Sequence, residues 1–298
     1  MFALPVIFGI DPSLGRLDYN YLSQQALMEL LIGGFQEVGQ ICGSREEPKD
    51  LTDWYGVTLD TSGEMVEEVY WTLLELKGSL HVQWAPPSIE NMTIRYNSLV
   101  GSLEMENLPA KLKFLYLSGN SFTGTINLTH LPACARELNL TENKLSGSIN
   151  LEELPTEIRI LDLSDNAFTG SINLTMLPAC LKKLSLRRNQ LSGHVNLSKL
   201  PVAFETLYLS RNAFTGSVDL TNLGEGMQGL HLGWNNFSGE VSFDRLPASM
   251  SFLNLSDTNL YGEITGMILD STHFDVSNTR IIKLIQPESN KEEDNNSE

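Results

Sequence analysis

The sequence predicts an α/β repeat solenoid of about ten turns with a parallel β-sheet on its concave face. The first observation is a period of 23 residues that holds without slippage over residues 115–262. The second is an asparagine in each repeat, and the third is a glycine four places after it. The repeated asparagines are Asn97, Asn120, Asn143, Asn166, Asn189, Asn212 and Asn235. A fixed period of this length is typical of solenoids, in which each repeat contacts only its neighbours.

Each position of the repeat has a physical role. Leu115 and Leu117 bracket a strand, and strand alternation turns both leucines inward and the residue between them outward. The asparagine amide has two donors and an acceptor for backbone groups at the following turn, so stacked turns are expected to share an asparagine ladder. Glycine permits a sharp bend and proline stiffens the last corner. The rest of the repeat forms the crossover that parallel strands require, and we expect this convex side to be mostly irregular or 3-10 helical.

Residues 1–68 lack the repeat and predict an N-terminal cap made of a helix and strands. Ser23 is a candidate N-cap, the leucines after it have helical spacing, and Gly33 and Gly34 would end the helix. Residues 54–60 and 66–71 alternate like strands. The open end of a solenoid needs such a cover. Counting back by the repeat period places the start of the array at residue 69, and the array is expected to span 69–264.

The period slips after Gly262, which predicts a C-terminal cap over residues 265–286. Residues 274–276 resemble one more strand. The apolar residues expected to close the core are Ile281, Ile282, Leu284 and Ile285. Residues 287–298 are polar and acidic, so they predict a disordered tail.

The repeats resemble the plant-type leucine-rich repeat, whose hallmark is L-x-G-x-I after the asparagine, as in residues 145–149. Residues 54–60 resemble the W-x-G-V-x-C-D stretch of that family's N-terminal cap. Leu59 stands where the family carries cysteine, so the cap disulfide of the family is absent. The stretch at 22–30, with Leu-x-x-Leu-Pro repeats, is also similar to leucine-rich repeat families of some unicellular eukaryotes. The resemblance implies a leucine-rich repeat horseshoe that recognises proteins.

Composition limits the partners and the location. The chain has 20 basic and 37 acidic residues, which argues against nucleic acid as the main partner. No stretch has the 18 apolar residues of a membrane span, and residues 1–15 make a poor signal peptide because no basic residue precedes their apolar run. Glycosylation sequons begin at Asn91, Asn127, Asn139, Asn173, Asn196, Asn236, Asn254 and Asn295. Glycans at Asn91, Asn139 and Asn254 would obstruct the concave face. These features favour a cytoplasmic location, with an extracellular or cell-surface location as the alternative.

The sequence contains no set of catalytic residues. It has no glycine-rich phosphate loop, no G-x-S-x-G elbow and no H-E-x-x-H motif. Cys42, Cys134 and Cys180 have no neighbours at metal-ligand spacing. Cys134 and Cys180 occupy equivalent positions two turns apart, about 10 Å, which is too far for a disulfide. We therefore expect a protein that is not an enzyme and that holds no metal or cofactor.

The outward residues of the concave sheet form the candidate site. Acidic residues in the middle repeats adjoin a basic group, and an aromatic group follows. The candidate partner-binding residues are Lys183, Arg187, Arg188, Tyr208, Arg211, His231, Trp234 and Phe252. Arginine and aromatic residues are enriched at interface hot spots, so we expect an acidic or aromatic-rich protein or peptide ligand.

Two alternatives stay open. Acid and base on adjacent strands could only neutralise each other, which explains the order of the charges but not the aromatic residues. A receptor-like extracellular domain that binds peptide or glycan is the alternative function.

Overall fold

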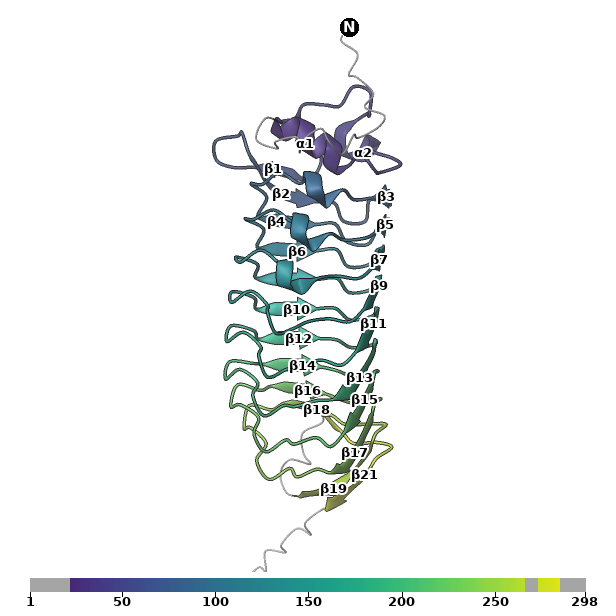
Figure 1. Cartoon of the computed structure of the whole chain (residues 1–298), viewed down its shortest axis with the longest axis vertical. Coiled ribbons are helices and arrows are strands. Elements are labelled where there is room, and N and C mark those ends of the chain that lie inside the picture. The colour runs from purple at the N-terminus through teal and green to yellow at the C-terminus, as the bar shows by residue number, and fades with distance from the viewer. Residues whose placement is uncertain (1–21, 266–272, 285–298) are drawn as a thin grey trace, which may run out of the picture.

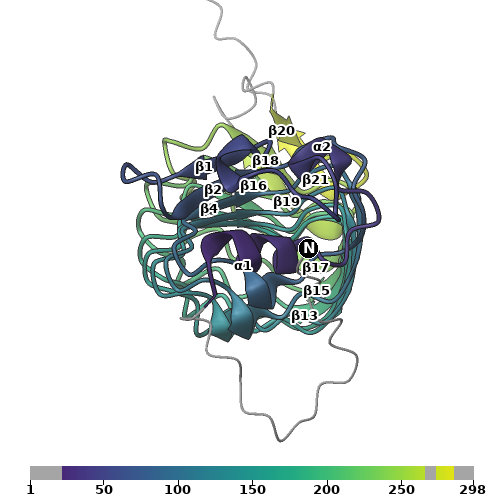
Figure 2. The same ribbon diagram turned by 90° about the horizontal axis from the view of Figure 1, so that it is seen from above.

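The computed structural model describes residues 22–265 and 273–284. Its turns stack into an elongated column with a cap at the N-terminal end (Figure 1). Each full turn contributes one strand to each of two sheets, an eleven-stranded sheet and a ten-stranded sheet over the described residues. Seen along the column, the two sheets lie on neighbouring sides of the turns and enclose the interior (Figure 2). The solenoid fold class expected from the sequence is confirmed.

Helix α1, Gln24–Leu31, begins the N-terminal cap. The Ser23 hydroxyl oxygen accepts a hydrogen bond from the Ala26 amide at 3.1 Å and so satisfies one of the unpaired donors of the first turn. Leu27, Met28 and Leu31 are buried on the face that meets the first turns of the array. The helical N-terminal cap expected from the sequence is therefore present. A second short helix, α2, Gly39–Cys42, was not expected.

The cap continues into the first sheet through an antiparallel pair. A 3-10 helix, η2, Leu51–Asp53, precedes β1, Val57–Leu59, which pairs with β2, Val66–Tyr70. Trp71 is fully buried, and its indole N–H donates to the Tyr55 carbonyl at 2.8 Å. This tryptophan ties the β1 hairpin to the interior of the first turn.

The first sheet is parallel from β2 onward. Its strands are two or three residues long beyond β2, and the central residue of each three-residue strand is a buried leucine or methionine. The strands are β4 Asn91–Thr93, β6 Phe114–Tyr116, β8 Glu137–Asn139, β10 Ile160–Asp162, β12 Lys183–Ser185, β14 Thr206–Tyr208, β16 Gly229–His231, β18 Phe252–Asn254 and β20 Phe274–Asp275.

The second sheet follows each ladder asparagine and is also parallel. A second sheet was not expected from the sequence, which predicts only an inward leucine or phenylalanine here. Most pairings of this sheet in the array join only two residues. The strands are β3 Lys77–Ser79, β5 Ser98–Gly101, β7 Ser121–Gly124, β9 Lys144–Gly147, β11 Ala167–Gly170, β13 Gln190–His194, β15 Ala213–Gly216, β17 Asn236–Glu240, β19 Asn259–Thr265 and β21 Arg280–Leu284.

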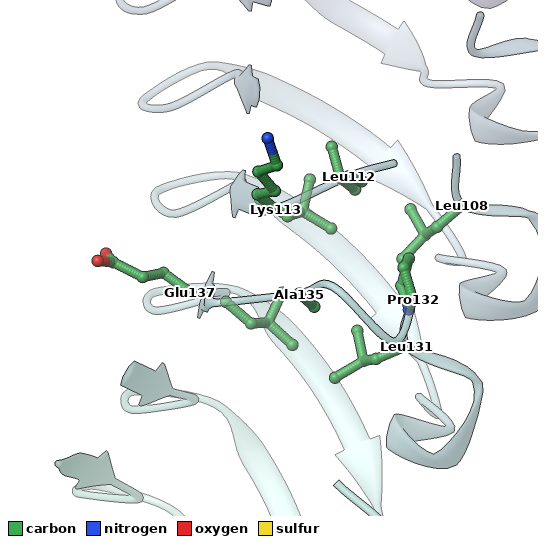
Figure 3. A pocket seen from close by; sticks show the side chains of 9 residues that line it. Leu108, Leu112, Lys113, Leu131, Pro132, Ala135 and Glu137 are labelled. Carbon is green, nitrogen blue, oxygen red and sulfur yellow. The ribbon is translucent and has the colours of Figure 1, made fainter. Parts of the chain in front are cut away.

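The return side of the first turns carries short 3-10 helices, and the later described turns return through bends and turns. These helices are η3 Val82–Trp84, η4 Met105–Asn107 and η5 Leu128–His130. Consecutive turns pack closely here. The gap between them near Leu131 and Pro132 is an apolar cavity of about 10 Å³, and the charged ends of Lys113 and Glu137 point away from its leucines (Figure 3). A space of this size has room for about one water molecule, so it is packing and not a ligand site.

The asparagines form a ladder of hydrogen bonds at the corner between the two sheets. The Asn143 side-chain amide donates to the carbonyls of Leu117, in the preceding turn, and Leu140, both at 3.1 Å. Its oxygen accepts from the Phe122 amide of the preceding turn at 3.0 Å. Asn120, Asn166, Asn189, Asn212 and Asn235 repeat the pattern. Asn97 begins the series. Its side-chain nitrogen donates to the Trp71 carbonyl, and its oxygen accepts from the Leu74 and Leu76 amides. Each ladder amide therefore joins one turn to the next.

The C-terminal end differs from the expectation. Ile281 packs against the core, but Ile282 is 55% exposed and Leu284 is 41% exposed. The prediction that these two residues close the core is wrong, because β21 pairs with β19 as the edge of the second sheet and strand alternation turns them outward. Ile285 and the acidic tail lie outside the described residues, as does the start of the chain at 1–15.

Candidate partner-binding face

Four consecutive turns bring the candidate residues together on one side of the first sheet. Tyr208 and His231 are neighbours in the register of β14 and β16. Lys183 begins β12 and Phe252 begins β18, each with its side chain on the outer face. The other four, Arg187, Arg188, Arg211 and Trp234, follow these strands in the turns before the ladder asparagines.

The aromatic residues form a row of rings across the strands. The Tyr208 and His231 rings stack at 4.5 Å with an interplanar angle of 18°. The ring centres of His231 and Phe252 are 6.3 Å apart, and those of Phe252 and His273 are 4.5 Å apart. Stacked rings of this kind add to the energy of apolar burial. Sequence reasoning missed His273 as a member because the repeat period slips before β20.

Burial and a nearby cation act on the imidazole in this row. Removal from water lowers the pKa of His231 below its usual value of 6.5, and the positive charge of Arg187 lowers it further. The imidazole is therefore neutral near pH 7, which suits its position between two rings.

The cations of the face are only partly paired. Arg188 forms an ion pair with Asp165 at 3.1 Å, so neutralisation across neighbouring strands accounts for this residue. Lys183, Arg187 and Arg211 form no ion pair with any described carboxylate. The charge of these three side chains remains available to a ligand.

Two of these cations lie against aromatic rings. The Lys183 ammonium is 5.4 Å from the centre of the Tyr208 ring, and the Arg211 guanidinium is 4.6 Å from the centre of the Trp234 ring. Trp234 is 51% exposed. Cation–π contacts hold the long cationic side chains in place without cancelling their charge.

The acidic part of the face is more fully engaged. Glu137 accepts a hydrogen bond from the Tyr116 hydroxyl at 2.5 Å. Burial and this carboxylate raise the pKa of Tyr116 well above its ordinary value. Arg95 lies over the same ring at 4.2 Å. Glu137 is therefore engaged by Tyr116, in contrast to the unpaired cations of the later turns.

A column of left-handed backbone runs beside the ladder. The residue before each ladder asparagine has φ between 51° and 66°, and bulky residues occupy it at Tyr96, Glu142, Arg188, Arg211 and Trp234. Residues other than glycine cost about 1–2 kcal/mol in this conformation. The same angle recurs before every ladder asparagine, so it belongs to the repeat and not to the candidate face alone. The residues before the ladder asparagines can be read from the sequence, but their backbone angle is known only from the structure.

The outer face of the second sheet has a different character. A row of hydroxyl side chains runs along it, with one residue from each turn, each exposed or half-exposed. The row consists of Thr123, Ser146, Thr169, Ser192, Thr215 and Ser238. Sequence reasoning missed it because the Thr-Gly and Ser-Gly pairs were interpreted only as corners of the repeat.

Residues 22–265 and 273–284 contain neither a metal-binding cluster nor a membrane-spanning helix. No group of three or more His, Cys, Asp and Glu side chains in these ranges could hold a metal ion. No helix formed by them is long and apolar enough to cross a membrane. Cys42, Cys134 and Cys180 are free thiols, and burial raises the pKa of Cys42.

Comparisons with known proteins agree with this architecture. The leucine-rich repeat family model matches residues 111–131. A plant ice-binding protein of known structure has a TM-score of 0.60 and 21% identity, over 89% of this chain and 94% of its own. The Arabidopsis receptor kinase HAESA, solved with the peptide hormone IDA and the co-receptor SERK1, has a TM-score of 0.50 and 23% identity, over 86% of this chain and 53% of its own. No curated protein matches the sequence.

The parallel strands, the asparagine ladder and the two-sheet turn define the class as a leucine-rich repeat solenoid. Its repeats carry the L-x-G-x-I pattern and so resemble the plant-type leucine-rich repeat, and the family model matches one of them at residues 111–131.

Proposed function

We propose that this chain is a protein-recognition module or scaffold that binds a protein or peptide segment on the outer face of the first sheet. The observation that carries the proposal is the unpaired cationic group beside the stacked rings. Lys183, Arg187 and Arg211 keep their charge in a chain of net charge −17. A local reversal of charge that adjoins exposed aromatic residues is characteristic of an interaction surface.

The chemistry of the face fits an acidic or aromatic-rich ligand. Arginine side chains bind carboxylates through paired hydrogen bonds, and the rings supply apolar area. The HAESA complex is one example of a peptide hormone bound to a protein with this fold. A receptor-like ectodomain that binds peptide or glycan would use the same face, and glycans on the protein from its native source would favour that form.

The test is a capture experiment from native lysate with three proteins. The first is the wild type, and the second carries Arg187→Glu, Arg188→Glu and Trp234→Ala. The third carries Lys144→Glu, Lys199→Glu and Met176→Ala, which make the same change of charge and also remove an exposed apolar side chain, at exposed positions away from the face. We expect partners that the wild type and the third protein capture and the second loses. Identical partner sets for all three would contradict the proposal.

A second candidate function is the binding of ice by the second sheet. The hydroxyl row favours this candidate. The row is uncharged from Thr123 to Ser238 and repeats at the strand spacing of about 4.8 Å. A regular array of identical groups suits a ligand that is itself periodic. The plant ice-binding protein, which has a similar fold, supports this candidate.

Thermal hysteresis and inhibition of ice recrystallisation test the second candidate. We expect activity in the wild type and its loss in the double variant Thr169→Lys, Ser192→Lys, because two long cations would interrupt the row. Tyr208→Lys with Phe252→Lys adds two cations to the first sheet, should keep the activity and serves as the matched control. A wild type without activity excludes this candidate.

A further inference from the structure

Gly229 stands out among the residues that begin the strands of the first sheet. The equivalent positions in the other three-residue strands carry a side chain, as in Ile160, Lys183, Thr206 and Phe252. Gly229 is absent from the glycines with positive φ, so its backbone does not require glycine. Glycine inside a strand weakens the sheet, and it often marks a place where a ligand approaches closely. The backbone conformation alone gives no reason for this glycine.

The missing side chain opens a hollow on the candidate face. A Cβ atom on Gly229 would lie 3.0 Å from the Thr206 methyl carbon and 3.8 Å from the Phe252 Cβ, so it would stand between these two side chains. Thr206 and Phe252 are two strands apart, about 9–10 Å. The hollow has a volume of about 220 Å³. It is a slot one strand wide with the backbone of β16 as its floor.

The walls of the slot combine rings with polar groups. Phe252, 43% exposed, stands at one end, and the stacked Tyr208 and His231 rings run along one side. Gln228 and Ser251 line the hollow as well, and the Ser251 hydroxyl donates to the Gln228 carbonyl at 3.2 Å. A flat ring that entered the slot could stack on Phe252 while a polar atom on its rim met the Gln228 amide.

The charges beside the slot identify the kind of ligand. Lys183 lies over the Tyr208 ring, and Arg187 is close enough to His231 to lower its pKa. Both cations are without a described acidic partner, so they can pair with carboxylates that flank an inserted ring. A neutral sugar could also stack in the slot, but it would leave these cations unused and would need polar partners around its whole rim. Charge complementarity therefore favours a peptide.

We infer that the hollow over Gly229 binds the ring of one tryptophan or tyrosine in an acidic peptide segment. This inference rests on the proposed recognition function and assigns its specificity to one place on the face. The ring anchors the segment in the slot, and the neighbouring cations hold carboxylates on either side of it.

The experiment compares two pools of fluorescent ten-residue peptides made from Asp, Glu, Ser and Gly. One pool carries Trp at a central position and the other carries Ala there. We expect the wild type to bind the Trp pool at least about tenfold more tightly, a difference of about 1.4 kcal/mol, because buried aromatic anchors dominate interface energies. Gly229→Ala should remove most of this preference by filling the floor, and the Thr206 methyl group, 3.0 Å from the new Cβ, must shift slightly to make room for it.

Two further variants test whether the preference for Trp depends on the slot. Phe252→Ala removes the stacking wall at an exposed position and should also reduce the preference for Trp. Ile160→Ala changes the same strand position three strands away and should leave binding of both pools unchanged. Equal binding of the two pools by the wild type, or a preference that Gly229→Ala leaves intact, would overturn the inference.

The outcomes separate this inference from the function on which it rests. If the charge-reversed triple variant loses its partners while Gly229→Ala retains them and the pools bind equally, the face recognises a ligand without the slot. If the triple variant keeps its partners and neither pool binds, both proposals fail. Binding of chitotetraose that Gly229→Ala abolishes, without binding of the Trp pool, would assign the slot to a sugar and overturn the peptide inference.

Discussion

The outer faces of the two sheets come from the same 23-residue repeat but carry different chemistry. Along the first sheet the middle outward residue changes from turn to turn, as in Asp162, Ser185, Tyr208 and His231. Along the second sheet the equivalent residue alternates between threonine and serine over six consecutive turns. A face that varies along its length can specify one ligand at one place. A face that repeats can only meet a ligand with the same repeat.

The interior beneath both faces is uniform, so stability does not explain the difference between them. Leu184 of the first sheet and Phe168 of the second are both fully buried, and the same holds for their equivalents in most turns. The ladder asparagines lie between the sheets and serve both. The variation of the first face is therefore free to serve recognition.

The largest expected effect on stability comes from the asparagine ladder, which both sheets share, and not from either outer face. Asn143→Ala removes the acceptor of the Phe122 amide and the donors to Leu117 and Leu140, all of them buried. Buried polar groups without partners are costly, so we expect the free energy of unfolding to fall by about 3 kcal/mol in urea denaturation.

Variants on the faces of the same turn are the controls. Ser146→Ala on the second sheet should change the free energy of unfolding by less than about 0.5 kcal/mol. Asn139→Ala on the first sheet removes the acceptor of the half-exposed Thr141 amide and should cost less than about 1 kcal/mol. If Asn143→Ala were as mild as these two, the ladder would not be what joins the turns.

The frame was predictable from the sequence because each turn repeats the same physical requirement. Leucine pairs such as Leu138 and Leu140 set the first sheet, and Asn143 sets the corner after it. The second sheet was not predictable in the same way, since pairings such as Ala167 with Ser146 involve too few residues to leave a period-two pattern. At the end of the array, Ile282 and Leu284 were assigned to the core by their apolar character, but they are exposed on an edge strand.

The candidate face was only partly predictable. Strand alternation indicated which side chains point outward, among them Tyr208 and Phe252. Three features depend on geometry that a sequence does not contain: the ion pair of Arg188 with Asp165, the left-handed backbone at Trp234, and the hollow over Gly229. Gly229 itself was visible in the sequence, but it was one glycine among many.

A smaller effect is expected at the strained column beside the first sheet. Glu142 has φ of 56° and no described side-chain partner, so Glu142→Gly should raise the free energy of unfolding by about 1 kcal/mol. Glu142→Ala keeps the strain and is the matched control. Gly119 occupies the same position of its repeat, and a Cβ there would lie 2.4 Å from the Tyr96 ring, so Gly119→Ala should destabilise. Equal stability of the two Glu142 variants would show that the backbone is not strained.

The smallest effect concerns pH and belongs to the first face alone. The pKa of His231 is lowered in the folded protein by burial and by Arg187, from an ordinary value of 6.5. Above that pH the imidazole is neutral in both states and contributes nothing to the pH dependence. As the pH falls below 6.5, the unfolded chain binds the proton more readily than the folded chain, and the free energy of unfolding decreases until the folded imidazole is protonated too.

Melting temperatures of the wild type and of His231→Phe at pH 7.5 and pH 5 measure this effect. The phenylalanine ring keeps an aromatic group between Tyr208 and Phe252 but binds no proton, so its melting temperature should fall less across this interval. Groups elsewhere that titrate in the same range act equally on both proteins and cancel in the comparison. A larger fall for the variant than for the wild type would mean that His231 is charged in the folded protein, and the ring row would then carry a cation at its centre.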